Sequence, residues 1–172
     1  MSDFDNHKRQ YLNNLDHAHV AYHYLYSTIS TENQFANDKE VIIGNFHFRK
    51  TSDAESIRIE LGWAFFTRLE AILEVFTKKL NIKLSKKMSL LDYLKKHNVV
   101  TPNDFIKGLE VYREIRNTLH HGDGDVSLLK NKAKHLKGSP GKEIHLLPDH
   151  IKNFHELFQW LGDVLPKTLE QP

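Results

Sequence analysis

The sequence predicts an all-α fold, in which four long helices and one short helix pack into a bundle. Apolar residues recur at three- and four-residue steps through most of the chain, which is the period of an amphipathic helix. Several of these periodic segments begin at residues that commonly cap helices. The 172 residues include no cysteine, which excludes disulfide scaffolds and thiolate metal sites. We therefore expect a single helical domain that spans residues 1–172.

Two long amphipathic segments occupy the first half of the chain. The first runs from about Asp5 to Ser30. The second begins at Ser52 or Asp53, either of which can cap a helix, and it runs to about residue 80. The apolar residues that define the two faces are Tyr11, Leu15, Ala18, Tyr22, Leu25, Tyr26 and Ile29 in the first segment, and Ile57, Leu61, Ala64, Phe65, Ile72, Val75 and Phe76 in the second.

The stretch between these helices contains two short apolar runs near residues 40–49. The runs 41–43 and 46–48 flank a Gly44-Asn45 pair, which is a common hairpin turn. Two interpretations stay open here, a small β-hairpin insert or an irregular apolar loop.

Three further helices are expected in the second half. Ser89 caps a short helix, and Thr101 caps a longer one that has Pro102 at its first position and ends at Gly122. Pro148-Asp149 opens the last helix. The apolar residues of the two long helices are Phe105, Leu109, Tyr112, Ile115 and Leu119, and then Ile151, Phe154, Leu157, Phe158, Leu161, Val164 and Leu165.

Charge is unevenly distributed along the chain although its formal net charge is only +2. Residues 1–77 hold 7 basic and 11 acidic side chains, and residues 78–172 hold 17 and 11. Two lysine-rich stretches, 78–96 and 130–142, either contact a polyanion or form a solvated surface. The lysines we consider for RNA contact are Lys86, Lys87, Lys130 and Lys132.

No apolar run approaches the roughly 18–20 residues that a membrane helix needs. The N-terminus is polar and acidic and has none of the apolar core of a signal peptide. We therefore expect a soluble, cytoplasmic protein that has no membrane partner.

Arginine at position 116 is the first candidate functional residue. On a helical wheel Arg116 falls between Phe105 and Leu109, inside the apolar stripe of its helix. A guanidinium there needs an anionic partner, since burying an unpaired charge is costly. The partner is either a phosphate or a carboxylate of the protein, for which the candidates are Glu60, Glu70 and Glu74. Arg68 also falls inside the apolar face of its helix and either lines the same site or pairs with a helix neighbour.

Two adjacent histidines follow Arg116 in the last turn of the same helix. His120 is four residues from Arg116, and His121 is four residues from Asn117, so each pair shares a face. The C-terminal end of a helix stabilises an imidazolium, whereas a neighbouring arginine disfavours it. One helix end thus presents a guanidinium, an amide and two imidazoles, a set that suits proton transfer at a phosphate.

The string Arg116-Asn117-x-x-x-His121-Gly122 resembles the R-x4-6-H motif of HEPN domains. The motif covers about six residues, and the helical pattern extends the resemblance loosely over most of the chain, giving a HEPN-like helical bundle. The resemblance implies a metal-independent endoribonuclease that needs no cofactor and acts as a homodimer, with the two motifs facing each other. Members often act as toxins or in defence against phage, so an antitoxin or defence protein is an expected partner. Some members are non-catalytic, and a binding or dimerisation module is the alternative.

The resemblance also implies a role for each residue of the motif. His121 would be the acid–base group, Arg116 would stabilise the phosphorane, and Asn117 would orient His121 or a phosphate oxygen. On an ideal helix Arg116 and His121 diverge by about 140°, and Arg116 and His120 by about 40°. Either the helix unwinds before Gly122, or the two residues act from different subunits, or His120 contributes.

Metal hydrolysis and base stacking are the competing interpretations. His17 and His19, or His120 and His121 with Asp123 and Asp125, carry metal-ligating atoms, but no H-E-x-x-H or EF-hand pattern is present. The aromatic residues that could stack on bases, for which core or interface packing is the competing explanation, are Tyr22, Tyr24, Tyr26, Phe46 and Phe48.

Overall fold

A computed structural model of the chain describes residues 3–31, 41–43, 46–48, 51–84, 88–122 and 146–169. Side chains are described for these residues except 29–31, 41–43, 46–48, 51–56 and 119–122. The described part is mainly helical, which confirms the all-α prediction. Its elements are α1 (Asp3–Thr31), β1 (Val41–Ile43), β2 (Phe46–Phe48), α2 (Thr51–Lys79), α3 (Leu90–Lys96), α4 (Asn103–Gly122), α5 (Pro148–Val164) and a final 3₁₀ turn, η4 (Pro166–Leu169).

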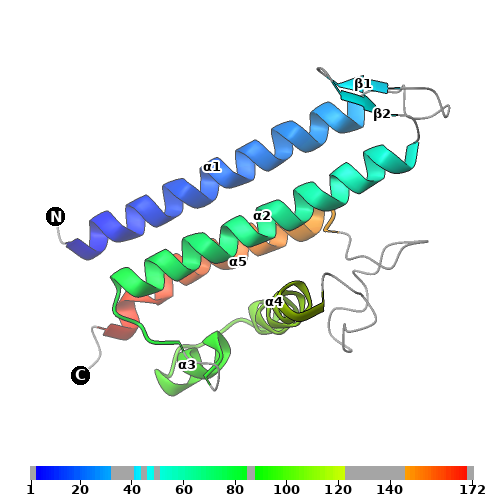
Figure 1. Cartoon of the computed structure of the whole chain (residues 1–172). Coiled ribbons are helices and arrows are strands. Elements are labelled where there is room, and N and C mark those ends of the chain that lie inside the picture. The colour runs from blue at the N-terminus through cyan, green and yellow to red at the C-terminus, as the bar shows by residue number, and fades with distance from the viewer. Residues whose placement is uncertain are drawn as a thin grey trace.

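Three long helices lie alongside one another, and two others pack at their side (Figure 1). Helix α1 packs along α2, and both contact α5. Helix α4 contacts α5, and α3 contacts α4. The arrangement places the C-terminal half of α4, which carries the candidate motif, beside the middle of α2.

The two short strands confirm the hairpin interpretation of residues 41–48. They pair antiparallel, with Val41 opposite Phe48 and Ile43 opposite Phe46. The strand pair lies between α1 and α2 in the sequence, so it is an insert in a helical fold rather than a separate layer.

One hydrophobic core cluster draws residues from all five α-helices described. Phe66 of α2 is fully buried, and its ring lies 5.3 Å from that of Tyr112 on α4 and 5.5 Å from that of Phe154 on α5. These contacts fix the position of α4 one turn before Arg116. The core therefore determines where the candidate motif lies relative to α2.

A close approach of helix backbones holds α1 against α5. A side-chain carbon at Gly162 would lie 2.9 Å from the ring of Tyr11, so only glycine allows this contact without a shift. The Tyr11 hydroxyl also donates a hydrogen bond to the carbonyl of Phe158 (2.9 Å). Burial raises the pKa of the Tyr11 phenol well above its usual value, so it remains a donor.

The capping predictions hold for one helix and shift by one residue for another. Ser89 accepts a hydrogen bond from the Asp92 amide, and the Asp92 carboxylate accepts one from the Ser89 amide, which is a complete capping box. Thr101 was expected to cap α4 with Pro102 at its first position, but the helix begins one residue later, and the Thr101 hydroxyl donates to the Val99 carbonyl. The first carbonyl to accept a helical bond is that of Pro102, so α4 begins at Asn103.

Helix α2 buries some of the predicted residues, among them Phe65 and Phe76, but its buried face also differs from the prediction. Ala64 and Val75 were expected in its apolar face, but both are exposed. Phe66, Leu69 and Leu73 are buried instead. Because α2 contacts both α1 and α5, its buried surface is wider than one stripe, and a single wheel position does not define it.

Candidate functional site

Arg116 forms an ion pair that joins α4 to α2. Its Nε donates a hydrogen bond to a carboxylate oxygen of Glu70. The Glu70 side chain is only 14% exposed, whereas that of Arg116 is 55% exposed. This contact selects Glu70 from the three carboxylates considered as partners.

The exposure of Arg116 corrects the prediction that it lies inside the apolar stripe. Leu109, Tyr112 and Ile115 are buried as expected, but the Arg116 side chain leaves the core and places its head group at the surface. A long arginine stem can cover apolar surface while the charged end stays in water. Burial therefore does not force Arg116 to bind a ligand.

Electrostatics around the pair favour a permanently charged guanidinium. The hydrogen bond that Arg116 donates to Glu70 raises the pKa of Arg116. Glu74, one turn along α2, pairs with Lys78 at 2.6 Å, and this contact lowers the pKa of the Glu74 carboxyl. Burial and the neighbouring Glu70 charge raise the pKa of Tyr112, which keeps its phenol neutral. The local arrangement is a fixed cation beside two carboxylates.

Asn117 is exposed next to Arg116, at a position that a bound molecule can reach. His120 and His121 lie in the last turn of α4, and their side chains are outside the described residues. The helix continues through Gly122, so the suggestion that it unwinds before that residue is wrong. Arg116 and His121 therefore point in different directions from α4. Two explanations remain: the two residues act from different subunits, or His120 takes the place of His121.

Of the other residues considered for RNA contact, Arg68 alone lies in the described part of the chain. Lys86, Lys87, Lys130 and Lys132 lie outside the described residues. Arg68 is exposed rather than placed in an apolar face, and it lines a different feature, a groove between α1 and α2.

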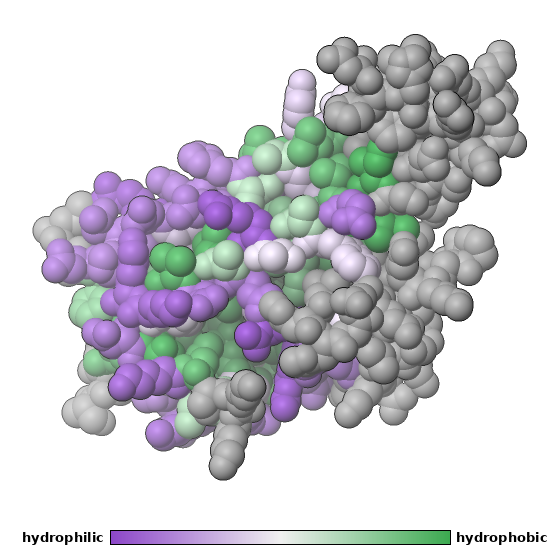
Figure 2. Space-filling view, viewed as in Figure 1, coloured by the Kyte–Doolittle hydropathy of each residue, from purple (hydrophilic) through white to green (hydrophobic). Residues whose placement is uncertain are grey.

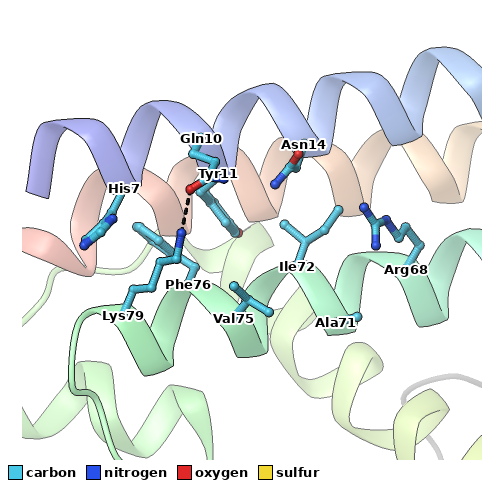
Figure 3. Close-up of a pocket in the computed structure, with 10 residues that line it drawn as sticks. All are labelled: His7, Gln10, Tyr11, Asn14, Arg68, Ala71, Ile72, Val75, Phe76 and Lys79. Carbon is cyan, nitrogen blue, oxygen red and sulfur yellow. Dashed lines mark hydrogen bonds between the residues drawn. The ribbon is translucent and has the colours of Figure 1, made fainter.

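This groove has a volume of about 170 Å³ and is drawn in Figure 3. His7, Arg68 and Lys79 place nitrogen atoms around it, and Lys79 donates a hydrogen bond to Gln10 across the two helices. Its floor is formed by buried core residues, among them Tyr11 and Phe76. Ligand pockets commonly enclose about 300 Å³ or more, so this groove is too small to hold a nucleotide by itself.

Most described aromatic candidates for base stacking pack inside the protein. Tyr22 is buried, and its hydroxyl donates to the Leu146 carbonyl at 3.2 Å. Tyr26 is half-buried against Tyr22, whereas the Tyr24 side chain is exposed. The side chains of Phe46 and Phe48 are outside the described part. Packing thus accounts for Tyr22 and Tyr26, and Tyr24 remains available at the surface.

A cluster of three histidines between α1 and α5 was not anticipated as a unit. The ring of His19 stacks on that of His155, with centroids 4.1 Å apart and planes inclined by 17°. The Nε2 atoms of His19 and His23 lie 2.9 Å apart. His155 Nε2 contacts Asp16 Oδ1 at 2.9 Å. The four-residue spacing of His19 and His23 was visible in the sequence, but their proximity to His155 required the fold.

The charge state of His19 follows from this environment. Partial burial lowers the pKa of His19 from 6.5 to about 4, and the neighbouring His155 and His23 rings act in the same direction. Asp16 opposes the shift. The His19 ring is therefore neutral near pH 7.

Within the described residues, no group of three or more histidine, cysteine, aspartate or glutamate side chains is placed to hold a metal ion. Asp123 and Asp125, which were considered as ligands with His120 and His121, lie outside that part. None of the described helices has the length and apolar character needed to cross a membrane. On the face that Figure 2 shows, hydrophilic residues and patches of hydrophobic residues both reach the surface.

Comparison with models of known families, with curated proteins and with solved structures finds no match to this chain. The resemblance to HEPN domains therefore rests on the short motif and on the helical pattern alone.

Proposed function

We propose that the protein is a metal-independent endoribonuclease of the HEPN type that acts as a homodimer. Arg116 stabilises the charge on the phosphorane, His121 or His120 exchanges the proton, and Asn117 orients the reacting groups. The single observation that supports the proposal most directly is the position of Arg116, which is exposed yet oriented by Glu70.

The Arg116–Glu70 contact suits this role because it uses Nε. A guanidinium has five donors in a planar fork, and engaging Nε leaves its terminal nitrogens to bind a phosphate. Glu70 is mostly buried and comes from a different helix, so it limits the rotation of the arginine head group. An oriented cation at the surface loses less freedom when it binds an anion.

The reaction needs a proton acceptor for the ribose 2′-hydroxyl and a proton donor for the departing 5′-oxygen. The 2′-oxygen attacks the adjacent phosphorus, the P–O5′ bond breaks, and a 2′,3′-cyclic phosphate forms. In the homodimer that we propose, two copies of the motif supply two imidazoles, one for each proton transfer. This arrangement also accounts for the divergence of Arg116 and His121 on one helix, because each would act with its counterpart in the second subunit.

The Arg116–Glu70 pair also supports a second candidate function, a non-catalytic helical binding or dimerisation module. In that case the pair serves only to join α2 to α4. Removing Arg116 would then change stability and leave no cleavage activity to lose.

The test is cleavage of varied single-stranded RNAs by the purified full chain in EDTA. We expect cleavage by the wild type, loss of at least about a hundredfold in His121→Ala or in Arg116→Lys, and nearly full activity in Arg113→Ala. Arg113 is an exposed arginine one turn earlier on α4 and is the matched control. Arg116→Lys keeps a positive charge that can pair with Glu70 but loses the planar five-donor guanidinium. A variant that stays folded and loses cleavage would therefore have lost phosphate binding rather than stability.

Three outcomes would contradict the proposal. A folded dimer that leaves all RNAs intact would favour the non-catalytic module. Cleavage that EDTA abolishes would indicate metal-dependent hydrolysis. Equal loss in Arg113→Ala and Arg116→Lys would show that the loss is not specific to Arg116 and its motif.

A further inference from the structure

The histidine pair on α1 places two potential metal ligands next to each other. His19 and His23 are four residues apart on one helix, and their Nε2 atoms lie 2.9 Å apart, within hydrogen-bond distance. Two imidazole nitrogens that bind one ion at a metal–nitrogen distance near 2.05 Å are separated by about 3 Å. The two rings therefore lie close enough to share one ion.

We propose that His19 and His23 form a bidentate site for a divalent transition metal such as Ni²⁺ or Cu²⁺. Imidazole nitrogen suits these ions, and tetragonal or octahedral geometry is typical of them. Since the described residues supply no third protein ligand, water fills the remaining positions. His23 is exposed, which gives the ion and its water ligands access to the site.

Neighbouring residues fix the orientation of the His19 ring before a metal binds. His155 stacks on His19 and is itself held by Asp16, which also accepts a hydrogen bond from Gln159 at 3.2 Å. This chain of contacts runs from α5 to α1 and restricts the rotation of the His19 ring.

The hydrogen bond between the two rings must break when a metal binds. In the metal-free pair one Nε2–H donates to the other Nε2. When the metal binds, the donating ring moves that proton to its Nδ1, so both rings stay neutral and both Nε2 lone pairs face the ion.

The test is Ni²⁺ and Cu²⁺ binding to the untagged full chain, freed of metal with EDTA that is then removed. Isothermal titration calorimetry with Ni²⁺ measures stoichiometry and affinity, and electron paramagnetic resonance of Cu²⁺ reports nitrogen ligands. Thermal unfolding with and without Ni²⁺ gives an independent measurement, because a ligand of the folded state raises Tm. His23→Ala removes one ligand, and His17→Ala is the matched control from an exposed position on the same helix.

We expect His23→Ala to lose one equivalent of Ni²⁺, or to bind it at least about tenfold more weakly, and to lose the rise in Tm. His17→Ala should match the wild type in both measurements, and circular dichroism should show that both variants are folded. If His23→Ala binds as the wild type does, the metal is taken up by other histidines and the proposal is wrong. These outcomes are independent of RNA cleavage, which is measured in EDTA.

Discussion

Replacing His19 with glutamine is expected to reduce the acid sensitivity of the fold between pH 6.5 and about 4. The folded chain holds the pKa of His19 near 4, whereas an unperturbed imidazole titrates at 6.5. Above pH 6.5 the ring is neutral in both states and has no effect. As the pH falls below 6.5, the unfolded chain takes up a proton that the folded chain does not, so the free energy of unfolding decreases until about pH 4.

The expected loss of unfolding free energy depends on the size of the His19 pKa shift and on the exposure of the His19 ring. One pKa unit corresponds to about 1.4 kcal/mol, so the full shift sets an upper limit of about 3 kcal/mol. His19 is only partly buried, and solvent screening reduces the expected loss to about 1 kcal/mol. In a chain of this length that equals a Tm decrease of roughly 2–4 °C.

The assay is urea unfolding of the wild type, His19→Gln and His17→Gln at several pH values from 7.5 to about 4. The His19→Gln variant also loses its stacking on His155 and its contact with His23, so the slope against pH is compared rather than the absolute stability. We expect a flatter slope only in His19→Gln, while His17→Gln keeps the wild-type slope. Equal slopes in all three proteins would refute the link between the cluster and acid sensitivity, as would flattening in His17→Gln.

Three further predictions concern packing and helix capping, each measured by urea or thermal unfolding. Phe66→Ala should destabilise the fold by about 3–5 kcal/mol, because it removes a fully buried ring at the centre of the core; a loss below about 1 kcal/mol would contradict this packing. Gly62→Ala should cost about 1–2 kcal/mol despite its better helix propensity, since the new carbon would lie 3.0 Å from the backbone carbonyl of Leu146; a stabilised variant would show that this segment moves easily. Ser89→Ala should cost about 1 kcal/mol by removing the capping box with Asp92, and no change would mean that α3 is held by its packing alone.

The local signals in the sequence were sufficient to find the helices. Apolar period and capping residues placed the boundaries of the five helices within a few residues, since these features depend on neighbours in the chain. The Gly44-Asn45 pair suggested a hairpin as one of two interpretations, and the paired strands between α1 and α2 decide for it. Burial on α2 was predicted less well, because that helix contacts two others and its exposed Val75 lies within an apparent apolar face.

In the candidate site, too, the sequence identified residues but not the contacts that they make. Sequence alone identified Arg116 and named Glu70 among three carboxylates, but a wheel could not show that the arginine side chain reaches the surface. Its direction depends on where α2 places Glu70, 46 residues away. The cluster of His19, His23 and His155 required the fold for the same reason, since α1 and α5 meet only in the folded chain.

Spacing along the chain thus determined which residues can form helices and which pairs share a helical face, because those relations are set by backbone geometry over a few residues. Tertiary structure alone decided which carboxylate meets Arg116, which ring stacks on His19, and whether each side chain lies in water or in the core. These contacts join helices that are distant in sequence, and they form only when burial of the shared core brings those helices together.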